Sequence, residues 1–294
     1  MLAQYIFDQI IKTPSDKKLK LKILKFLRAY ILKNNEPLIN YQFFQFKLSI
    51  FFSHDFPFNL KDVPEYSQNL GKIALILSRK YPELHIIDVG ANVGDSAAII
   101  KRKIDAPILC IEGNPRFLDL LEKNTKQFNS VSIEKCFVGD EELTVTPVNS
   151  LGTAYLEKSE NGIAVKPISS ILNKHQQFAK TKLLKIDTDG FDNKIIRGSR
   201  QFLIESKSSV FFEYDPYYLA MQNEKGTDIY DFLVGLNYTK FIIFDNLGDH
   251  LITLDNTQKE QFEQLHHYFD RRSSRYMDIW ALHKDDNDIT YSNS

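Results

Sequence analysis

The sequence predicts an α/β protein built on a Rossmann-like, doubly wound sheet, and three observations support this fold class. From residue 85 onward, short apolar runs typical of buried strands alternate with amphipathic segments typical of helices. A turn containing two glycines follows the first apolar run, and an acidic residue ends the second. Such alternation gives a mostly parallel sheet with right-handed crossovers, whose ligands bind at the carboxyl ends of the strands.

Length and composition are those of a folded, water-soluble protein. The 294 residues are 43% hydrophobic and 26% charged, and the formal net charge is −1. This balance argues against a basic nucleic-acid-binding surface. Cys110 and Cys136 lie in apolar runs, as expected of buried, reduced thiols. No apolar stretch approaches the roughly 20 residues of a membrane span, and no secretion signal is recognisable. We therefore expect a cytoplasmic protein.

The first 80 residues differ from the rest, so we expect an N-terminal helical and aromatic extension (1–80) and a ligand-binding α/β domain (81–294). Residues 2–11 and 16–33 predict two helices, and the second places Ile23, Leu24, Leu27 and Ile31 on one face. The second helix also carries seven basic residues and almost no acid. A basic amphipathic helix either lies peripherally on the anionic inner face of a membrane or packs on the main domain with its lysines in water.

An aromatic segment follows the two helices. Residues 41–58 contain seven phenylalanines, and apolar side chains alternate with polar ones from Phe44 to Phe52. This alternation predicts either a strand or an aromatic cover over the catalytic face. Residues 64–81 predict a helix that leads into the first strand of the main sheet.

The alternating region predicts seven strands. They are residues 85–89, 107–112, 131–138, 182–187, 208–214, 238–244 and 276–283. Predicted helices are residues 96–103, 115–127, 191–205, 227–236 and 257–270. The stretch 141–168 breaks the alternation and indicates extra β structure or loops inserted before the fourth strand.

The turn after the first strand predicts a nucleoside site. Asp88 ends the strand, and the spacing of Gly90 and Gly94 is G-x-x-x-G rather than the G-x-G-x-x-G of dinucleotide-binding proteins. Asp88 would also place a negative charge where a pyrophosphate sits. Both features favour S-adenosylmethionine, whose ammonium and sulfonium groups tolerate the acid. The candidate cofactor-binding residues of this turn are Asp88, Gly90, Ala91, Asn92 and Gly94.

Two further strand ends supply candidate contacts to the same nucleoside. Glu112 ends the second strand, where a carboxylate can accept hydrogen bonds from both ribose hydroxyls. Asn114 lies in the turn that follows it. Asp140 ends the third strand and is positioned to accept a hydrogen bond from the adenine amine.

Acidic residues gather at the ends of the fourth and fifth strands. Asp187 and Asp189 follow the fourth strand, and Glu213 closes the fifth. Crowded carboxylates have raised pKa values, which suits a general base that removes a hydroxyl proton. Alternatively, Asp187 and Glu213 bind a divalent metal through oxygen ligands. A purely structural alternative makes the two aspartates helix caps and pairs Glu213 with Lys185. Lys185 and His250 are the reserve candidates for the base.

Four segments of the chain resemble the FkbM family of S-adenosylmethionine-dependent methyltransferases. They are IDVGANVGD, CIEGNP, LLKIDTDGFDNKIIRGSRQFL and VFFEYDP, and together they cover about residues 80–215. By position, Asp88, Gly90, Asn92, Gly94 and Glu112 resemble the donor-binding residues of the family, and Asp187 and Asp189 resemble its reactive acids. In two departures, Gly113 stands where the family has proline, and Asp189 where it often has glutamate.

The resemblance implies a class I methyltransferase fold, a seven-stranded, mostly parallel sheet whose last strand is antiparallel. It also implies O-methylation of a hydroxyl on a sugar, a surface glycan or a related natural product. A nicotinamide-dependent oxidoreductase is the first alternative, although the missing third glycine and Asp88 argue against it. Nucleic-acid methyltransferases commonly have a D/N-P-P-Y-like element after the fourth strand, and this sequence lacks it. A nucleoside-binding module without catalysis is the remaining alternative.

Overall fold

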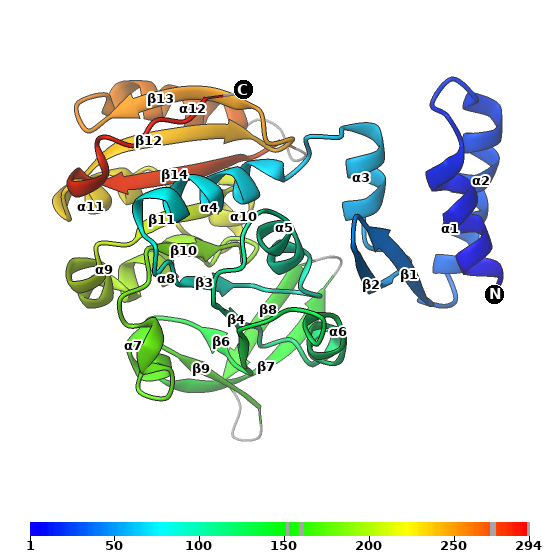
Figure 1. Cartoon of the computed structure of the whole chain (residues 1–294), viewed down its shortest axis with the longest axis horizontal. Coiled ribbons are helices and arrows are strands. Elements are labelled where there is room, and N and C mark those ends of the chain that lie inside the picture. The colour runs from blue at the N-terminus through cyan, green and yellow to red at the C-terminus, as the bar shows by residue number, and fades with distance from the viewer. Residues whose placement is uncertain (151–152, 159–161, 271–274, 293–294) are drawn as a thin grey trace.

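The computed structural model describes residues 1–150, 153–158, 162–270 and 275–292, and its centre is an eight-stranded mixed sheet (Figure 1). The strand order is β13-β12-β14-β11-β10-β3-β4-β5. In chain order these strands are β3 (Ile86–Val89), β4 (Ile108–Ile111), β5 (Val131–Glu134), β10 (Leu183–Ile186), β11 (Ser209–Tyr214), β12 (Tyr238–Asp245), β13 (His250–Asp255) and β14 (Met277–His283). The five strands from β5 to β11 are parallel, and β14 lies antiparallel between β11 and β12. The predicted doubly wound sheet with an antiparallel last strand is therefore confirmed.

Helices cover both faces of this sheet, so the sheet separates the hydrophobic core into two parts. Ile86 on β3 belongs to the core beneath α4 (Gln68–Lys80), α5 (Asp95–Lys103) and α6 (Pro115–Thr125). Ile87 belongs to the core on the other face, because successive strand residues point to opposite sides. That second face is covered by α7 (Ile168–Leu172), α8 (Asp192–Gly198), α9 (Arg200–Ser206), α11 (Asp228–Gly235) and α12 (Lys259–Asp270). The remaining short helices are η1 (Gln176–Phe178), α10 (Pro216–Met221) and η2 (Lys284–Asp286).

Three sequence predictions need correction at the level of single elements. The predicted helix 191–205 is two helices, α8 and α9, that meet at Ser199, where Gly198 packs against the backbone of Asp140. An eighth strand, β13, was not predicted, and His250 begins this strand instead of lying in a turn. The predicted helix 64–81 begins only at Gln68.

The inserted stretch before β10 forms a second sheet. Its strands are β6 (Phe137–Val138), β7 (Leu143–Ser150), β8 (Thr153–Lys158) and β9 (Ile163–Lys166), in the order β6-β9-β7-β8. The prediction of extra β structure over 141–168 is therefore confirmed for the described residues. The predicted strand 131–138 is divided at Lys135 and Cys136, so that β5 joins the main sheet and β6 pairs with β9.

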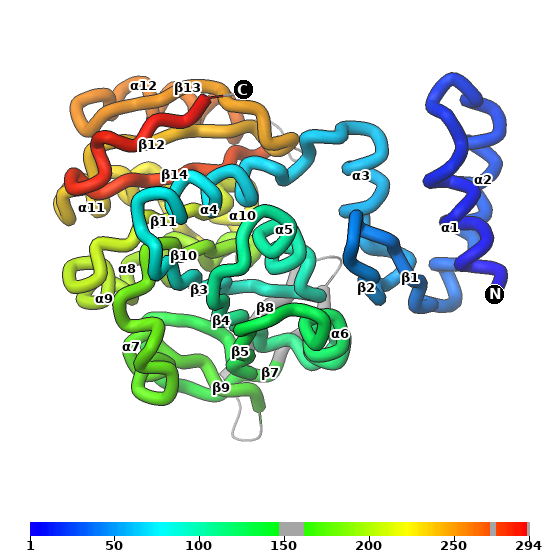
Figure 2. Tube along the Cα trace, viewed as in Figure 1, coloured from blue at the N-terminus to red at the C-terminus, as the bar shows by residue number. Residues whose placement is uncertain are grey.

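The first 62 residues form a separate group of elements at one end of the molecule (Figures 1 and 2). In chain order they are α1 (Leu2–Lys12), α2 (Lys18–Leu32), β1 (Leu38–Phe43), β2 (Phe46–Phe51) and α3 (Phe56–Asp62). β1 and β2 form an antiparallel hairpin, so part of the aromatic segment is a strand as predicted. The hairpin is tied to the main domain by Asn124 of α6, whose amide accepts from Ser49 N–H at 2.8 Å and donates to Ser49 O at 2.9 Å.

The α2 helix does not bury the face that the sequence predicted. Leu24 is buried, but Ile23 and Leu27 are 53% and 39% exposed. None of the helices within the described residues has both the length and the apolar character that a membrane crossing requires.

Candidate active site

The turn after β3 is the structural base of the site. Its backbone takes positive φ angles at Gly90 (73°), Asn92 (47°) and Gly94 (87°). A Cβ atom on Gly90 would lie 1.9 Å from the carbonyl oxygen of Asp187, so only glycine fits there. Ala91 is fully buried between these residues, and its N–H donates to Ile111 O at 3.2 Å. Gly90 and Asn92 line the pocket above the turn, whereas Ala91 and Gly94 shape the turn beneath it.

A buried ion pair fixes this turn to the fourth parallel strand. Asp88 on β3 and Lys185 on β10 occupy the same register of neighbouring strands, so their side chains share one face of the sheet. Lys185 Nζ lies 3.0 Å from Asp88 Oδ1 and donates to Gly90 O at 3.1 Å. Ser96 Oγ donates to the other carboxylate oxygen of Asp88. Asp88 is 0% exposed and is not among the residues that line the pocket over the turn or the polar cavity beside it, so it supports the turn from below.

The ion pair also settles the protonation of Lys185. Burial alone would lower its pKa, but the carboxylates of Asp88 and Asp187 raise it above the ordinary lysine value. A lysine held in the charged form is no general base. The predicted pairing of this lysine with Glu213 is not found; its second acidic neighbour is Asp187, at 3.5 Å.

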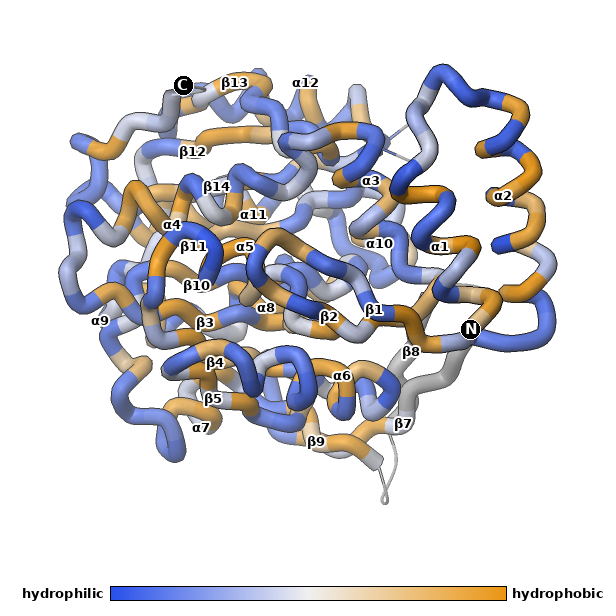
Figure 3. Tube along the Cα trace, turned by 45° about the vertical axis from the view of Figure 1, so that its right-hand side comes forward, coloured by the Kyte–Doolittle hydropathy of each residue, from blue (hydrophilic) through white to orange (hydrophobic). Residues whose placement is uncertain are grey.

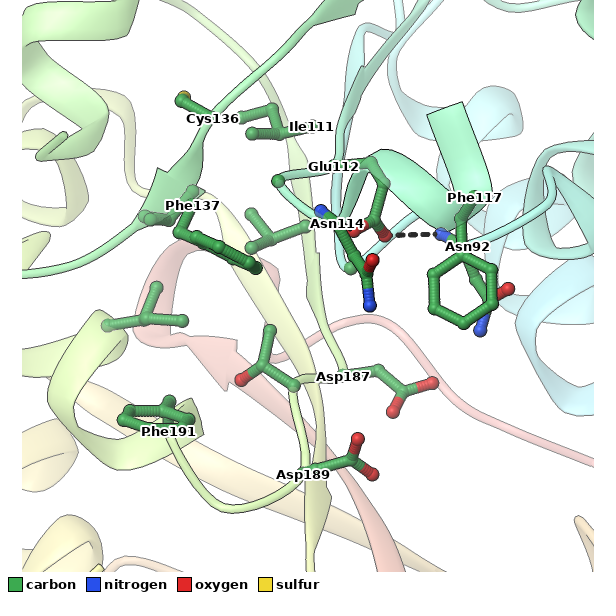
Figure 4. Close-up of a pocket in the computed structure, with 16 residues that line it drawn as sticks. Asn92, Ile111, Glu112, Asn114, Phe117, Cys136, Phe137, Asp187, Asp189 and Phe191 are labelled. Carbon is green, nitrogen blue, oxygen red and sulfur yellow. Dashed lines mark hydrogen bonds between the residues drawn. The ribbon is translucent and has the colours of Figure 1, made fainter. Parts of the chain in front are cut away.

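Glu112 holds the rim of the pocket at the end of β4. Its carboxylate accepts from Asn92 N–H at 2.9 Å (Figure 4). It also accepts from Asn114 N–H at 2.7 Å. Asn114 in turn accepts from Arg116 N–H and caps the N-terminus of α6. Burial raises the pKa of Glu112, while the donated N–H groups oppose that rise. A carboxylate has about four acceptor positions, so these N–H groups leave room for a hydroxyl group of a ligand.

The pocket has an apolar wall that the sequence did not reveal. Phe117, Phe137 and Phe191 line it together with Ile111 and Val138. A Cβ on Gly113 would lie 2.4 Å from the ring of Phe137. The ring of Phe137 therefore occupies the space that a proline at position 113 would need, which explains the first departure from the family pattern. Asp140, expected at the adenine, is exposed and does not line the pocket, although Phe137 and Val138 of β6 just before it do.

Two acids at the end of β10 join this pocket to a second cavity. Asp187 and Asp189 line both, and Glu213 lines the second only. Asp189 and Gly190 take positive φ angles of 51° and 97°, which return the chain toward the pocket after β10. Figure 4 shows the carboxylates of Asp187 and Asp189 projecting to the same side of the pocket. The predicted acid cluster is therefore present at this edge of the sheet.

The pKa values of these acids differ. The carboxyl of Asp189 is open to solvent at the cavity mouth, yet the protein around it and the nearby Asp187 raise its pKa to about 6. Burial raises the pKa of Glu213 well above its ordinary range, and Asp187 and Asp192 reinforce the rise. Asp192 accepts from Thr188 Oγ1 and Gly190 N–H and so holds the loop before α8. The N-cap residue of α8 is Phe191, and no side-chain hydrogen bond caps the helix, so the two predicted acids are not its caps.

The second cavity is polar and is assembled from distant parts of the chain. One wall comes from residues 54–70, and another from Tyr276 and Asp278 at the start of the strand β14. His54 Nε2 lies 3.7 Å from Asp95 Oδ2. Burial raises the pKa of Asp278 to about 8. Sequence reasoning missed the following lining residues, which follow no strand end of the alternating region: His54, Tyr66, Asn69, Asp95, Tyr276 and Asp278.

The structure gives no support to a metal at the acid cluster. In the described parts of the chain, no group of three or more His, Cys, Asp or Glu side chains is arranged to hold a metal ion. The alternative role of Asp187 and Glu213 as metal ligands therefore has no structural basis. His250, the other reserve base, pairs with Thr253 on β13 and lines neither cavity.

Comparisons with known proteins agree with the resemblance seen in the sequence. Residues 88–241 match the profile of the "Methyltransferase FkbM domain". No curated protein matches the chain. The solved structures of similar fold include the methyltransferase FkbM from Methylobacillus flagellatus KT, at 20% identity and a TM-score of 0.38, covering 54% of this chain. This chain spans only 39% of that protein.

Two further structures have the same degree of similarity. A putative O-methyltransferase from Klebsiella pneumoniae is 12% identical, with a TM-score of 0.40 and coverage of 73% of this chain and 80% of its own. The O-methyltransferase TomG from Streptomyces achromogenes is 12% identical, with a TM-score of 0.41 and coverage of 72% and 79%. Scores this low add nothing to the match of the family profile. Because that profile covers more than half of the residues, the chain belongs to the FkbM family of S-adenosylmethionine-dependent methyltransferases.

Proposed function

We propose that this protein transfers a methyl group from S-adenosylmethionine to a hydroxyl oxygen of a neutral, hydroxyl-rich acceptor. A sugar of a surface glycan or a related natural product has this chemistry. The observation that carries the proposal is the contact between two cavities. The pocket over the glycine turn and the polar cavity share Gly90, Asn92, Asp187 and Asp189. A methyl donor bound in the first cavity and a methyl acceptor bound in the second would therefore meet beside Asp187 and Asp189.

The residues of the first pocket fit the cofactor. Glu112 has room left to accept from a ribose hydroxyl, and Phe117 and Phe137 give the apolar surface that a purine ring needs. Gly90, which has no side chain, lets a ligand approach the turn closely. When bound, the cofactor supplies an electrophilic methyl group on a sulfonium. The protein's task is to align the acceptor oxygen with it and to remove the hydroxyl proton.

The polar cavity favours neutral acceptors. Six carboxyl groups line it, and Lys185 is already paired with Asp88. The six are Asp55, Asp95, Asp187, Asp189, Glu213 and Asp278. Ionised carboxylates accept hydrogen bonds from hydroxyls but repel phosphates and carboxylates, so the cavity selects against anionic groups near the reacting oxygen.

Asp189 is the best candidate for the base. Its pKa of about 6 leaves it ionised at neutral pH and more basic than an ordinary aspartate. Glu213, with its strongly raised pKa, favours the neutral acid and is suited to donating a hydrogen bond to the acceptor.

In this proposal the two parts of the chain have different roles. Residues 81–294 hold the cofactor and the acids as the methyltransferase domain, and the extension of residues 1–80 supplies the cavity wall from His54 to Leu70. Because that wall lies outside the residues that match the family profile, we infer that acceptor choice is set there. The enzyme acts in the cytoplasm on small-molecule or glycan acceptors and not on nucleic acid.

The substitution Glu112→Gln tests the cofactor site. The amide can no longer accept from both Asn92 N–H and Asn114 N–H, and it loses the charge. Hydrogen bonds to charged groups contribute about 1.5–3 kcal/mol, so the Kd for S-adenosylhomocysteine should rise about 10- to 100-fold by calorimetry.

Asp140→Asn is the matched control, because Asp140 is exposed and outside the pocket. The control should bind like the unmodified protein. Tight binding of a nicotinamide dinucleotide with no heat from S-adenosylhomocysteine would contradict the assignment of the cofactor.

Methyl transfer itself is tested with a panel of acceptors. Neutral sugars and glycans should gain about 14 Da per transfer by mass spectrometry, the mass of one added CH₂. The same acceptors carrying a phosphate or carboxylate beside the hydroxyl should react more slowly, because of the acids in the cavity. Equal or faster transfer to the anionic series would overturn the predicted acceptor class.

A further inference from the structure

We propose that the outer face of α2 docks this protein on an anionic lipid membrane. Leu19, Ile23, Phe26 and Tyr30 are 74%, 53%, 70% and 63% exposed. Their spacing of four, three and four residues places them in one stripe along the helix. Figure 3 shows α2 at the outer edge of the molecule, with hydrophobic and hydrophilic residues in alternation along it.

The rest of the chain holds this stripe outward. On the opposite side of α2, Leu24 is buried in the core. Arg28 donates to Phe52 O at 3.1 Å and Ser53 O at 2.8 Å, and its guanidinium lies 4.2 Å from the ring centre of Phe58. Because these contacts fix the rotation of the helix, the stripe is not turned in to cover the protein's own core.

The charges around the stripe identify the partner. Lys18, Lys22 and Lys25 follow one edge of it at i, i+4 and i+7, and Lys20 lies at the other edge. Residues 1–33 carry eight basic and two acidic side chains, whereas the rest of the chain has more acids than bases. Each lysine near an anionic bilayer contributes about 1 kcal/mol of attraction, and the apolar stripe can insert at the headgroup boundary.

A second copy of the chain is a poorer partner for the same face. An isologous dimer would bring two copies of this lysine-rich helix together, and α2 itself contains no acid that could pair with them. A lipid surface offers negative charge to the lysines and an apolar interior to the stripe.

The test uses the full chain and co-sedimentation with phosphatidylcholine vesicles, prepared with and without phosphatidylglycerol. Binding should require phosphatidylglycerol and should weaken with added salt. The double variant Leu19→Ser/Phe26→Ser should reduce the partition coefficient at least about tenfold, because two exposed apolar side chains no longer insert. Lys22→Glu/Lys25→Glu should have an effect of similar size.

Leu251→Ser is the control, since Leu251 is also exposed (45%) but lies on β13 in a different part of the fold. It should bind vesicles like the unmodified protein. The inference fails if the unmodified protein does not sediment with anionic vesicles, or if Leu19→Ser/Phe26→Ser sediments equally well. A dimer in light scattering that this variant dissociates, with no vesicle binding, would reassign the face to a second copy of the chain. All of these outcomes are independent of methyl transfer, and binding of S-adenosylhomocysteine should be the same in every variant.

Discussion

Replacing Lys185 by methionine should destabilise the protein by about 3–5 kcal/mol, because it leaves the carboxylate of Asp88 buried without its counter-charge. The variant also loses the hydrogen bond from Lys185 to the carbonyl oxygen of Gly90, which fixes the turn beneath the cofactor. Urea denaturation should show a lower midpoint with an unchanged slope, and calorimetry should show weakened binding of S-adenosylhomocysteine.

The pH dependence of this defect distinguishes electrostatics from lost packing. Burial raises the pKa of Asp88, and Lys185 is the first of the groups that oppose this rise. Without the lysine, the folded protein gains stability when Asp88 takes up a proton, since the folded pKa, already raised by burial, then lies still further above the unfolded value. The stability defect of Lys185→Met should therefore shrink as the pH falls and grow as the pH rises.

The double variant Lys185→Met/Asp88→Asn is the control for the same prediction. It removes both charges, so it should recover part of the stability that the single variant loses. If Lys185→Met lowers the free energy of unfolding by less than about 1 kcal/mol, the buried pair does not stabilise the turn in the way its geometry indicates.

The main sheet was predictable because its strands are buried on both faces and therefore read as apolar runs. The strand β13 was not predicted from the sequence because it lies at the sheet edge, where only its Leu254 is buried. Its sequence, HLITLD, has three apolar residues, but two of them, Leu251 and Ile252, are exposed. The break between α8 and α9 was also hidden, because it depends on the close contact of Gly198 with Asp140 from another part of the chain.

Part of the site follows from strand ends and part does not. Glu112, Asp187 and Asp189 line the cavities, because each lies just beyond a parallel strand at the same edge of the sheet. Asp88 lies one residue earlier, inside its strand, and the strand alternation turns it under the glycine turn toward Lys185. Asp140 follows a strand that belongs to the second sheet.

The acceptor cavity was beyond prediction from the sequence. His54 and Tyr66 lie near one end of the chain and Asp278 near the other, and no local sequence pattern predicts that they line the same cavity. Only the pairing of β14 with β11 brings Asp278 beside Glu213. Spacing rules work within one crossover, whereas this cavity is made by contacts between segments that are more than 200 residues apart.

Asp189→Asn should lower kcat by about 10²- to 10⁴-fold while cofactor binding changes little, because asparagine cannot take the hydroxyl proton. The substitution suits its position, since Asp189 has a φ of 51° and asparagine tolerates that region better than most residues. Steady-state kinetics with a methylated acceptor, together with the calorimetric Kd for S-adenosylhomocysteine, separate the two effects.

The pH profile identifies which acid is the base. A base must be unprotonated, so kcat/KM of the unmodified enzyme should fall about tenfold per pH unit below the pKa of Asp189, about 6. Glu213→Gln should leave this acidic limb in place and reduce kcat less than Asp189→Asn does. Burial already favours the neutral form of Glu213, and an amide replaces a neutral acid with a neutral hydrogen-bonding group. If Glu213→Gln removes the acidic limb and Asp189→Asn keeps it, the proton goes to Glu213, and Asp189 only positions the acceptor.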